Sequence, residues 1–273
     1  MLILAGTPIG NIGDASSRLL LTLQQAEVIA AEDTRTLLKL ANHLGIKLKA
    51  ELVSLNEQNE LQKLDRLVEI AASSNLVLVS DAGMPTISDP GFALVRACSE
   101  QGVEIQVVPG PSSVIAALAV SGLSTDRFSF EGFIPRKSGE RKKSFQKLAS
   151  EPRTMIFFES PHRITESLAD AAAVFGGDRK ASLSRELTKK FEETLRGSLS
   201  ELADLAQDLK GEMVLVVAGA EQTQLAPETL VDMVLALRAE GSSLKDAARA
   251  IASEYGASTS ELYDLALKSR PSS

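Results

Sequence analysis

Up to Pro109, the chain alternates five short apolar runs with amphipathic segments. The runs lie at residues 2–5, 28–31, 52–55, 76–79 and 103–108. Strands that are apolar throughout are buried on both faces, which is typical of a parallel sheet. Strands that alternate with helices form right-handed α/β units. We therefore predict a parallel, five-stranded α/β domain over residues 1–112, with four helices between its strands.

The expected helices of this domain have recognisable ends. Asp14 can cap the first helix, and Gly45 can close the second. Asp89 and the following Pro90 supply an N-cap and a first-turn proline for the fourth helix. These residues predict where each helix begins or ends.

The alternation becomes less regular after the segment P-G-P-S-S at residues 109–113. A helix of small residues is expected at 114–121, and further helices at 140–149, 162–175 and 199–209. Strands are expected at 128–133, 154–158, 181–184 and 213–218. Because strands and helices are mixed here, we predict a second, mixed α+β domain over residues 113–224.

The last part of the chain has helical patterns only, at residues 230–238, 244–255 and 260–267. A four-residue connection, G-A-S-T, separates the last two, which is the length of a helix-turn-helix connection. We predict a small helix-turn-helix-like domain over residues 225–273. From Pro227 onward it has seven acidic and five basic residues. Groove-reading modules are usually basic, so a structural or dimer-supporting role is as well supported as RNA contact.

Composition excludes several classes of protein. The 273 residues contain one cysteine, Cys98, so no intrachain disulfide can form, and the two histidines lie far from it in sequence, unlike a zinc site. No stretch approaches the length of a membrane helix, and M-L-I-L leads into a strand without the basic region of a signal peptide. We expect a cytoplasmic protein without a bound metal. The net charge of −7 argues against a general coat for nucleic acid.

The loop S-D-A-G-M-P-T-I-S-D-P-G, at residues 80–91, follows the fourth apolar run. Ligands of open α/β sheets bind outside the carboxyl ends of the strands, so this loop is placed to hold a small molecule. The first such loop, G-T-P-I-G-N-I-G-D, does not fit G-x-G-x-x-G, and the chain has no G-x-x-x-x-G-K-[ST] motif. A common dinucleotide or phosphate loop is therefore disfavoured.

Polar residues follow the second strand as Glu32-Asp33-Thr34-Arg35. Asp33 or Thr34 can simply cap a helix, with Glu32 at its positive end. Alternatively, the carboxylates can orient or deprotonate a hydroxyl group while Arg35 holds a phosphate. Polar segments also follow later strands, as F-F-E-S-P-H-R at residues 157–163 and R-E-L-T-K-K at 185–190.

A basic segment interrupts the acidic chain between Glu131 and Ser150. It has six basic and two acidic residues, a local charge of +4, and it includes P-R-K-S-G-E-R-K-K. Lysines on a helix are often only a solvated surface. A basic loop that opposes the overall charge nevertheless favours a polyanion such as RNA. We predict RNA contacts at Arg136, Lys137, Arg141, Lys142 and Lys143.

Seven motifs together resemble those of one family: T-P-I-G-N, A-A-E-D-T-R, S-D-A-G-M-P-T-I-S-D-P-G, P-G-P-S-S, E-G-F-I-P-R-K-S-G, F-F-E-S-P-H-R and S-R-E-L-T-K-K-F-E-E. They are similar to the ribosomal RNA small subunit methyltransferase I family, within the tetrapyrrole methylase superfamily. The resemblance extends along the chain in order. It implies a class III methyltransferase fold and S-adenosyl-L-methionine-dependent methylation of a cytidine ribose 2′-hydroxyl in the decoding region of 16S ribosomal RNA, commonly by a homodimer.

The resemblance also implies the cofactor contacts. They are Pro8, Asp81, Ala82, Gly83, Met84, Ser112, Ser113, Phe158, Leu187 and Met213. Glu159 is expected beside Phe158 on the adenine side.

The chemistry of the 2′-hydroxyl suggests further site residues. This hydroxyl is a poor nucleophile, so a carboxylate or lysine should help to remove its proton. The candidates are Asp33, Glu159, Glu186 and Lys189, with Arg35 and Arg185 as phosphate or oxyanion partners. Two other functions stay open, a tetrapyrrole or corrinoid C-methyltransferase and a non-catalytic RNA-binding protein of ribosome assembly. The basic segment favours RNA over a macrocycle, and the complete set of cofactor motifs favours activity.

Overall fold

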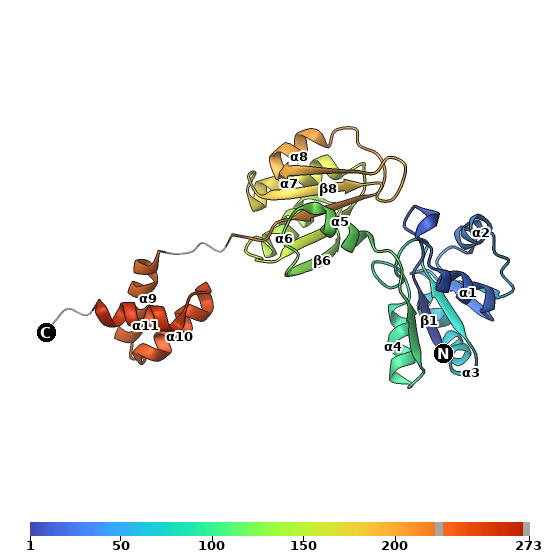
Figure 1. Cartoon of the computed structure of the whole chain (residues 1–273), viewed down its shortest axis with the longest axis horizontal. Coiled ribbons are helices and arrows are strands. Elements are labelled where there is room, and N and C mark those ends of the chain that lie inside the picture. The colour runs from blue at the N-terminus through green and yellow to red at the C-terminus, as the bar shows by residue number, and fades with distance from the viewer. Residues whose placement is uncertain (222–225, 270–273) are drawn as a thin grey trace. The chain divides into compact units, whose positions relative to one another are not determined.

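Five parallel strands form the first sheet, in the order β3-β2-β4-β1-β5. Figure 1 shows this sheet, with β1 labelled, among the helices labelled α1 to α4. We describe residues 1–221 and 226–269 from a computed structural model. The strands are β1 (Leu2–Ala5), β2 (Val28–Ala31), β3 (Glu51–Ser54), β4 (Leu76–Val79) and β5 (Ile105–Val108). The helices between them are α1 (Ser17–Gln25), α2 (Thr34–His43), α3 (Glu60–Ser73) and α4 (Phe92–Glu100), preceded by the short 3-10 helix η1 (Ile12–Asp14). The predicted parallel α/β architecture is confirmed.

Apolar residues cover both faces of this sheet. Leu2, Ala30 and Leu78 belong to one buried cluster, which includes residues of α3 and α4. Ile29 and Val77, their neighbours along the strands, belong to a second cluster that includes residues of α1 and α2. Alternate residues of each strand therefore face opposite layers, which explains why the strands are apolar throughout.

The second sheet is mixed and has the order β6-β7-β10-β8-β9. Its strands are β6 (Phe128–Phe133), β7 (Thr154–Glu159), β8 (Lys180–Arg185), β9 (Glu193–Ser198) and β10 (Met213–Val217). Only β6 and β7 pair in parallel, and the other neighbours are antiparallel. Helices α6 (Ser138–Lys147), α7 (Ile164–Phe175) and α8 (Leu199–Leu205) contribute to one apolar core against this sheet. The predicted mixed α+β arrangement is confirmed, with β9 as an additional strand.

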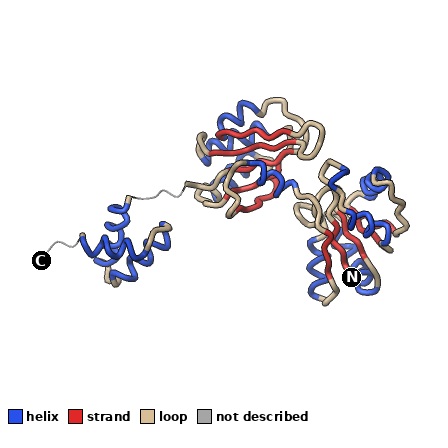
Figure 2. Tube along the Cα trace, in the orientation of Figure 1, coloured by secondary structure: helices blue, strands red, loops and turns tan. Residues whose placement is uncertain are grey.

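Helix α5 (Ser113–Ser121) follows the first sheet but packs on the second. Its residues Val114, Ala117 and Leu118 belong to one cluster with Val216 of β10. Ile9, from the loop after β1, belongs to the same cluster. Figure 2 shows the loops that lie between the red strands of the two sheets. Because Ile9 and α5 join the second core, loops of both sheets lie next to each other.

Several predicted helix starts were wrong. Ser16, rather than Asp14, caps α1, because the Asp14 region forms η1. Helix α4 begins at Phe92 after Gly91, which has a φ of 119°, so neither Asp89 nor Pro90 is part of it. Glu60 of α3 instead accepts the amide hydrogens of Gly91, Ala93 and Leu94 at 3.1, 3.0 and 3.4 Å. Helix α7 begins at Ile164, two residues after the predicted start at His162.

The chain separates into two compact units, residues 1–219 and 220–273. The second unit contains α9 (Pro227–Ala239), α10 (Leu244–Tyr255) and α11 (Thr259–Lys268), which share a small apolar core. The predicted boundary at 112/113 stays a prediction, and the one at 224/225 falls on residues 222–225, which lie outside the described residues. None of the helices that the structure describes combines the length and apolar content needed to cross a membrane.

Candidate functional site

The loops after β1, β4 and β5 are held together by backbone contacts. The amide of Thr7 donates to the carbonyl of Gly83 at 2.8 Å, and the amide of Gly83 donates back at 3.1 Å. Gly6 and Gly110 touch backbone to backbone, since a Cβ added at Gly6 would lie 2.7 Å from Gly110 Cα and 2.6 Å from Met84 Sδ. Even one added methyl group would require these neighbours to move. The three loops therefore form one rigid edge at the carboxyl end of the first sheet.

The loop of residues 80–91 adopts an unusual backbone. Gly83 and Gly91 have φ values of 82° and 119°, and the non-glycine residues Thr86 and Ser88 have values of 75° and 62°. A left-handed conformation costs free energy in a non-glycine residue and is concentrated at functional sites. This backbone supports the predicted role of the loop in ligand binding.

A cavity of about 590 Å³ lies between these loops and the second sheet. This volume is in the range that accommodates small-molecule ligands and cofactors. Its walls come from loops of the first sheet, from α5 and from the strand ends of the second sheet: Ile9, Ala82, Ser113, Phe133, Phe158, Glu159, Ser160, Pro161, Glu186, Leu187, Lys189, Gly211, Glu212, Met213 and Val214. The wall therefore combines apolar side chains with the charged residues Glu159, Glu186, Lys189 and Glu212.

A smaller cavity, of about 70 Å³, shares the wall residues Ala82, Ser113 and Phe158 with the larger one. Eight of the ten predicted cofactor residues line one or both cavities: Ala82, Gly83, Met84, Ser112, Ser113, Phe158, Leu187 and Met213. Pro8 and Asp81 line neither. The structure thus brings together residues that are far apart in sequence and that were chosen from separate motifs.

Glu186 and Lys189 form a charged corner of the larger cavity. Lys189 Nζ lies 3.1 Å from Glu186 Oε1 and 3.0 Å from Glu212 Oε2. Burial acts to lower the pKa of Lys189, but the hydrogen bonds from Glu212 and Glu186 outweigh it and raise the pKa. Burial likewise acts to raise the pKa of Glu186, yet its bonds to Lys189 and the Glu212 amide leave that pKa lowered. At neutral pH this corner therefore holds an ammonium and a carboxylate.

The loop that carries this corner is strained and touches the first loop of the chain. Glu186 and Thr188, on either side of Leu187, have φ values of 49° and 65°. Thr188 Oγ1 accepts the amide hydrogen of Asn11 at 3.0 Å. This contact ties the loop after β8 to the loop after β1.

Asp33 and Arg35 lie outside both cavities. Asp33 caps α2 and pairs with Arg35 at 2.7 Å, where the Arg35 side chain is 85% exposed. The hydrogen bonds from Arg35 lower the pKa of Asp33 to about 2. A carboxylate with such a low pKa is a weak base, so the geometry favours the capping role of Asp33 over proton removal. Arg185 is also in an ion pair, with Glu193 at 2.7 Å.

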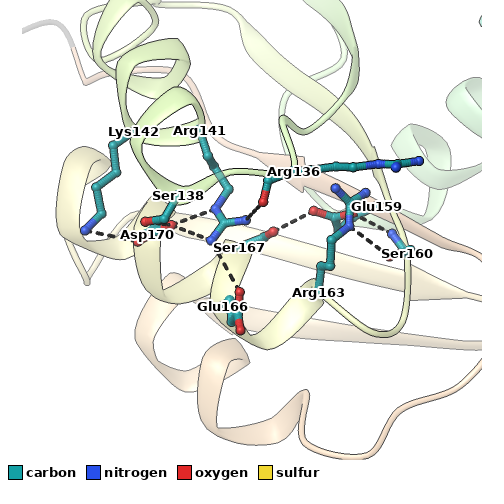
Figure 3. Close-up of polar contacts among 10 residues, drawn as sticks. All are labelled: Arg136, Ser138, Arg141, Lys142, Glu159, Ser160, Arg163, Glu166, Ser167 and Asp170. Carbon is teal, nitrogen blue, oxygen red and sulfur yellow. Dashed lines mark hydrogen bonds and ion pairs between the residues drawn. The ribbon is translucent and has the colours of Figure 1, made fainter.

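Glu159 lines the larger cavity, but its carboxylate is buried and fully occupied (Figure 3). One oxygen accepts from Ser167 Oγ at 2.5 Å, and the other accepts from the Ser160 amide at 2.7 Å and pairs with Arg163. These partners hold the segment after β7 against α7. The arrangement favours a positioning role for Glu159.

The basic segment divides into one buried and several exposed residues. Arg141 is buried and pairs with Asp170 of α7 at 2.6 Å, and its Nη1 donates to the Arg136 carbonyl at 3.3 Å. Figure 3 shows the Arg136 side chain leading away from this network, and Arg136, Lys137, Lys142 and Lys143 are exposed. Arg141 therefore holds the segment in place, and its buried guanidinium group favours this structural role over the predicted RNA contact.

Three carboxylates, Glu32, Asp81 and Asp89, follow strands β2 and β4, and of these Asp81 is a predicted cofactor contact. Burial, with repulsion from Asp81, raises the pKa of Glu32, and burial, with repulsion from Asp33, raises the pKa of Asp81. Burial, with repulsion from Glu32 and Asp81, raises the pKa of Asp89 to about 6. Asp89 also lines the smaller cavity. Asp89 lies inside the predicted ligand loop, and this position could have suggested a role in the site. The sequence analysis instead interpreted Asp89 as a helix cap.

The sequence profile of the tetrapyrrole (corrin/porphyrin) methylases matches residues 1–203. The chain belongs to the tetrapyrrole methylase family. Solved structures agree in fold: the methyltransferase CobJ is 19% identical, with a TM-score of 0.61, over 80% of this chain and 94% of that one. A uroporphyrin-III C-methyltransferase from Thermus thermophilus, solved with S-adenosylhomocysteine, is 17% identical, with a TM-score of 0.56, over 80% and 96%.

Curated relatives are more similar and carry one name. A protein of Mycobacterium tuberculosis strain CDC 1551 is 45% identical over 98% of this chain and 95% of its own length. One of Haemophilus influenzae is 43% identical over 98% and 96%, and one of Escherichia coli O157:H7 is 43% identical over 96% and 93%. All three are named ribosomal RNA small subunit methyltransferase I. The resemblance that the seven motifs indicated is confirmed.

Proposed function

We propose that this protein transfers a methyl group from S-adenosyl-L-methionine to a cytidine ribose 2′-hydroxyl in the decoding region of 16S ribosomal RNA. The observation that carries the proposal is the cavity of about 590 Å³, which gathers residues from the separate cofactor motifs. The relatives' shared name supports small-subunit RNA as the substrate. The fold neighbour solved with S-adenosylhomocysteine supports the cofactor.

The charges around the two cavities fit this cofactor. S-adenosylmethionine carries a positive sulfonium and an ammonium group, and carboxylates near a cation stabilise it. Asp89 lines the smaller cavity, and its pKa is raised in part by repulsion from Glu32 and Asp81. A bound cation would relieve that repulsion. We therefore place the methionine part of the cofactor toward Asp89, and the adenine toward Phe158, Leu187 and Met213.

The sulfonium supplies an activated methyl group, so the protein's main task is to position the acceptor hydroxyl in line with it. Of the four candidate bases, Glu186 and Lys189 line the larger cavity and pair with each other at its charged corner. Lys189 is protonated and can donate a hydrogen bond to the 2′-oxygen, while Glu186 can accept the hydroxyl hydrogen. We propose this pair as the residues that orient the hydroxyl.

The exposed basic residues provide a surface for the RNA backbone. Arg136, Lys137, Lys142 and Lys143 project from a segment that begins three residues after Phe133 in the cavity wall. Phosphates held there would keep an RNA strand near the cavity mouth. We also propose that the protein acts in the cytoplasm, where its ribosomal substrate is found, and as a homodimer, as the family resemblance implies.

A tetrapyrrole acceptor is the second candidate, because the fold neighbours include a uroporphyrin-III C-methyltransferase. At 17% identity that similarity concerns the fold alone. Incubation with labelled S-adenosylmethionine and either small subunits from a methylation-deficient strain, free RNA or a precorrin separates the possibilities. We expect label in the RNA of the subunits. Label in the precorrin would establish the tetrapyrrole reaction, and binding of subunits without transfer would establish a non-catalytic role.

A further inference from the structure

Phe133, the last residue of β6, is a large apolar side chain that is 60% exposed. It also lines the larger cavity. Its ring packs edge-on against Phe158 with the centroids 5.3 Å apart, and Phe158 packs in the same way against Phe130 at 4.8 Å. The ring is thus supported from the cavity wall while most of its surface stays in water. An exposed aromatic ring at a cavity mouth is typical of a ligand-stacking residue.

The backbone on the carboxyl side of Phe133 is fixed. Ile134 is buried, and its amide donates to the carbonyl of Phe158 at 3.1 Å. Further along, buried Arg141 bonds the Arg136 carbonyl and pairs with Asp170 (Figure 3). Phe133 and the cationic side chains of Arg136 and Lys137 are therefore presented by one rigid segment.

The Arg136 side chain is free to contact a ligand. Among the described residues, the Arg136 side chain makes no ion pair, and Lys137 has one exposed pair with Glu140 at 3.4 Å. Exposed pairs of this kind contribute little free energy and exchange readily for other anions. The segment thus offers an aromatic surface and two cations within five residues.

We propose that Phe133 is the platform on which an unstacked nucleobase of the RNA acceptor rests, with Arg136 and Lys137 contacting the phosphates beside it. This inference rests on the proposed function, because it assigns the acceptor of the same cavity. Proteins that select single-stranded RNA splay its bases onto aromatic rings and hold its backbone with basic residues. A base on Phe133 leaves its own ribose at the cavity mouth, where the 2′-hydroxyl can face Glu186 and Lys189.

The other ring that Phe133 could stack is the adenine of the cofactor. Phe158, Leu187 and Met213 lie deeper in the wall and are less exposed than Phe133. They suffice for an enclosed adenine, and the exposed position of Phe133 suits a ligand that arrives from solvent. The two assignments predict different effects of the same substitution.

The test uses the full chain with the substitutions Phe133→Leu and Phe133→Tyr. Leucine keeps an apolar side chain but removes the stacking surface, and tyrosine restores it. Phe128→Leu is the matched control, because Phe128 begins the same strand, is 38% exposed and lines neither cavity. The measurements are KM and kcat with small subunits from the methylation-deficient strain, and the Kd of S-adenosylmethionine by calorimetry.

We expect Phe133→Leu to raise the KM for subunits by about 10-fold, given the usual strength of base stacking on aromatic rings. The Kd of the cofactor should stay unchanged, and Phe133→Tyr and Phe128→Leu should behave like the wild type. An unchanged KM in Phe133→Leu would overturn the proposal, and so would a parallel loss of cofactor affinity. If the wild type itself transfers no methyl group to subunits, the proposed function fails instead, so the two failures are distinguishable.

Discussion

At the scale of single residues, the smaller cavity contains a carboxylate whose charge opposes the stability of the free protein. This carboxylate is Asp89. Burial raises its pKa from 3.8 to about 6, so the folded protein binds this proton more tightly than the unfolded chain does. Stability therefore falls as the pH rises from about 4 to about 6, and the ionised carboxylate is destabilising at neutral pH. A carboxylate that destabilises the folded protein in this way is typical of a ligand-binding site.

The substitution Asp89→Asn should consequently change stability and binding in opposite directions. Without cofactor at pH 7.5, we expect a free energy of unfolding higher by about 1 kcal/mol, less than the full pKa shift implies because the side chain is partly exposed. The affinity for S-adenosylmethionine should fall by about 10-fold, since an opposite charge beside the cation is lost. Chemical denaturation and calorimetry measure the two quantities.

The pH dependence supplies the control for this prediction. In the wild type, cofactor affinity should rise as the pH increases through about 6, where Asp89 ionises. In Asp89→Asn that increase should disappear. A variant that binds the cofactor as tightly as the wild type at pH 7.5 would contradict the placement of the methionine part.

At the scale of elements, α7 connects the basic segment with the cavity wall. Its Asp170 holds Arg141 of α6, and its Ser167 holds Glu159 at the end of β7. Burial acts to raise the pKa of Asp170, but the hydrogen bonds from Ser138, Arg141 and Lys142 leave it lowered. The helix thus fixes two parts of the proposed acceptor site through one buried ion pair and one buried hydrogen bond.

Asp170→Asn should lower the free energy of unfolding by about 3 kcal/mol at pH 7, because it leaves the buried Arg141 charge without its main partner. Since the pKa of Asp170 is lowered in the folded state, this contribution is present above the ordinary carboxyl pKa and lost as the pH falls below it. The difference between variant and wild type should therefore shrink in acid. Denaturant titrations at several pH values measure it.

Glu100→Gln is the matched control for that experiment. It breaks the ion pair of Arg96 and Glu100. Their distance of 2.8 Å is similar to the 2.6 Å between Arg141 and Asp170, but their side chains are 69% and 63% exposed. We expect a much smaller change than for Asp170→Asn, since surface pairs contribute little. Equal effects of the two substitutions would show that the Asp170 pair is not structural.

The strands of the two sheets could be predicted well, and the reason is physical. The runs at β1, β2 and β4 are apolar throughout because both faces of the sheet are covered, so their bounds were correct. Strand β9, with the sequence E-T-L-R-G-S, lies at the edge of the second sheet and lacks such a run, so it was missed. Helix starts were less predictable, because Asp14 and Asp89 are good capping residues that the tertiary structure uses elsewhere.

The candidate site was likewise predictable from the sequence only in part. Motifs after successive strands predicted residues that lie together at the two cavities, because parallel strands bring their carboxyl ends to one edge. Motifs could not show that Asp33 pairs with Arg35, that Glu159 is occupied by Ser167 and Arg163, or that Arg141 is buried. Those properties depend on contacts between residues and decide which candidates remain available for chemistry.

At the scale of the whole molecule, every residue that lines the two cavities lies between Ile9 and Val214. The residues that the structure describes in the compact unit 220–273 contribute none of them. We therefore expect a chain that ends at Ala226 to bind S-adenosylmethionine with the affinity of the full chain, as measured by calorimetry. A cofactor affinity reduced more than about 10-fold would contradict this independence.

The same truncated chain decides what the carboxyl-terminal helices do. A loss of affinity for small subunits with unchanged cofactor affinity would assign them to RNA contact. Unchanged subunit affinity, with a change in oligomeric state by light scattering, would assign them to assembly.

The central claim is that this protein methylates a ribose of the small-subunit RNA, and mapping of ribose methylation in cells that lack its gene tests it most directly. We predict the loss of 2′-O-methylation at one cytidine of the decoding region, restored by the wild-type gene and not by a variant with both Glu186→Gln and Lys189→Met. An unchanged methylation map in the cells that lack the gene would contradict the account.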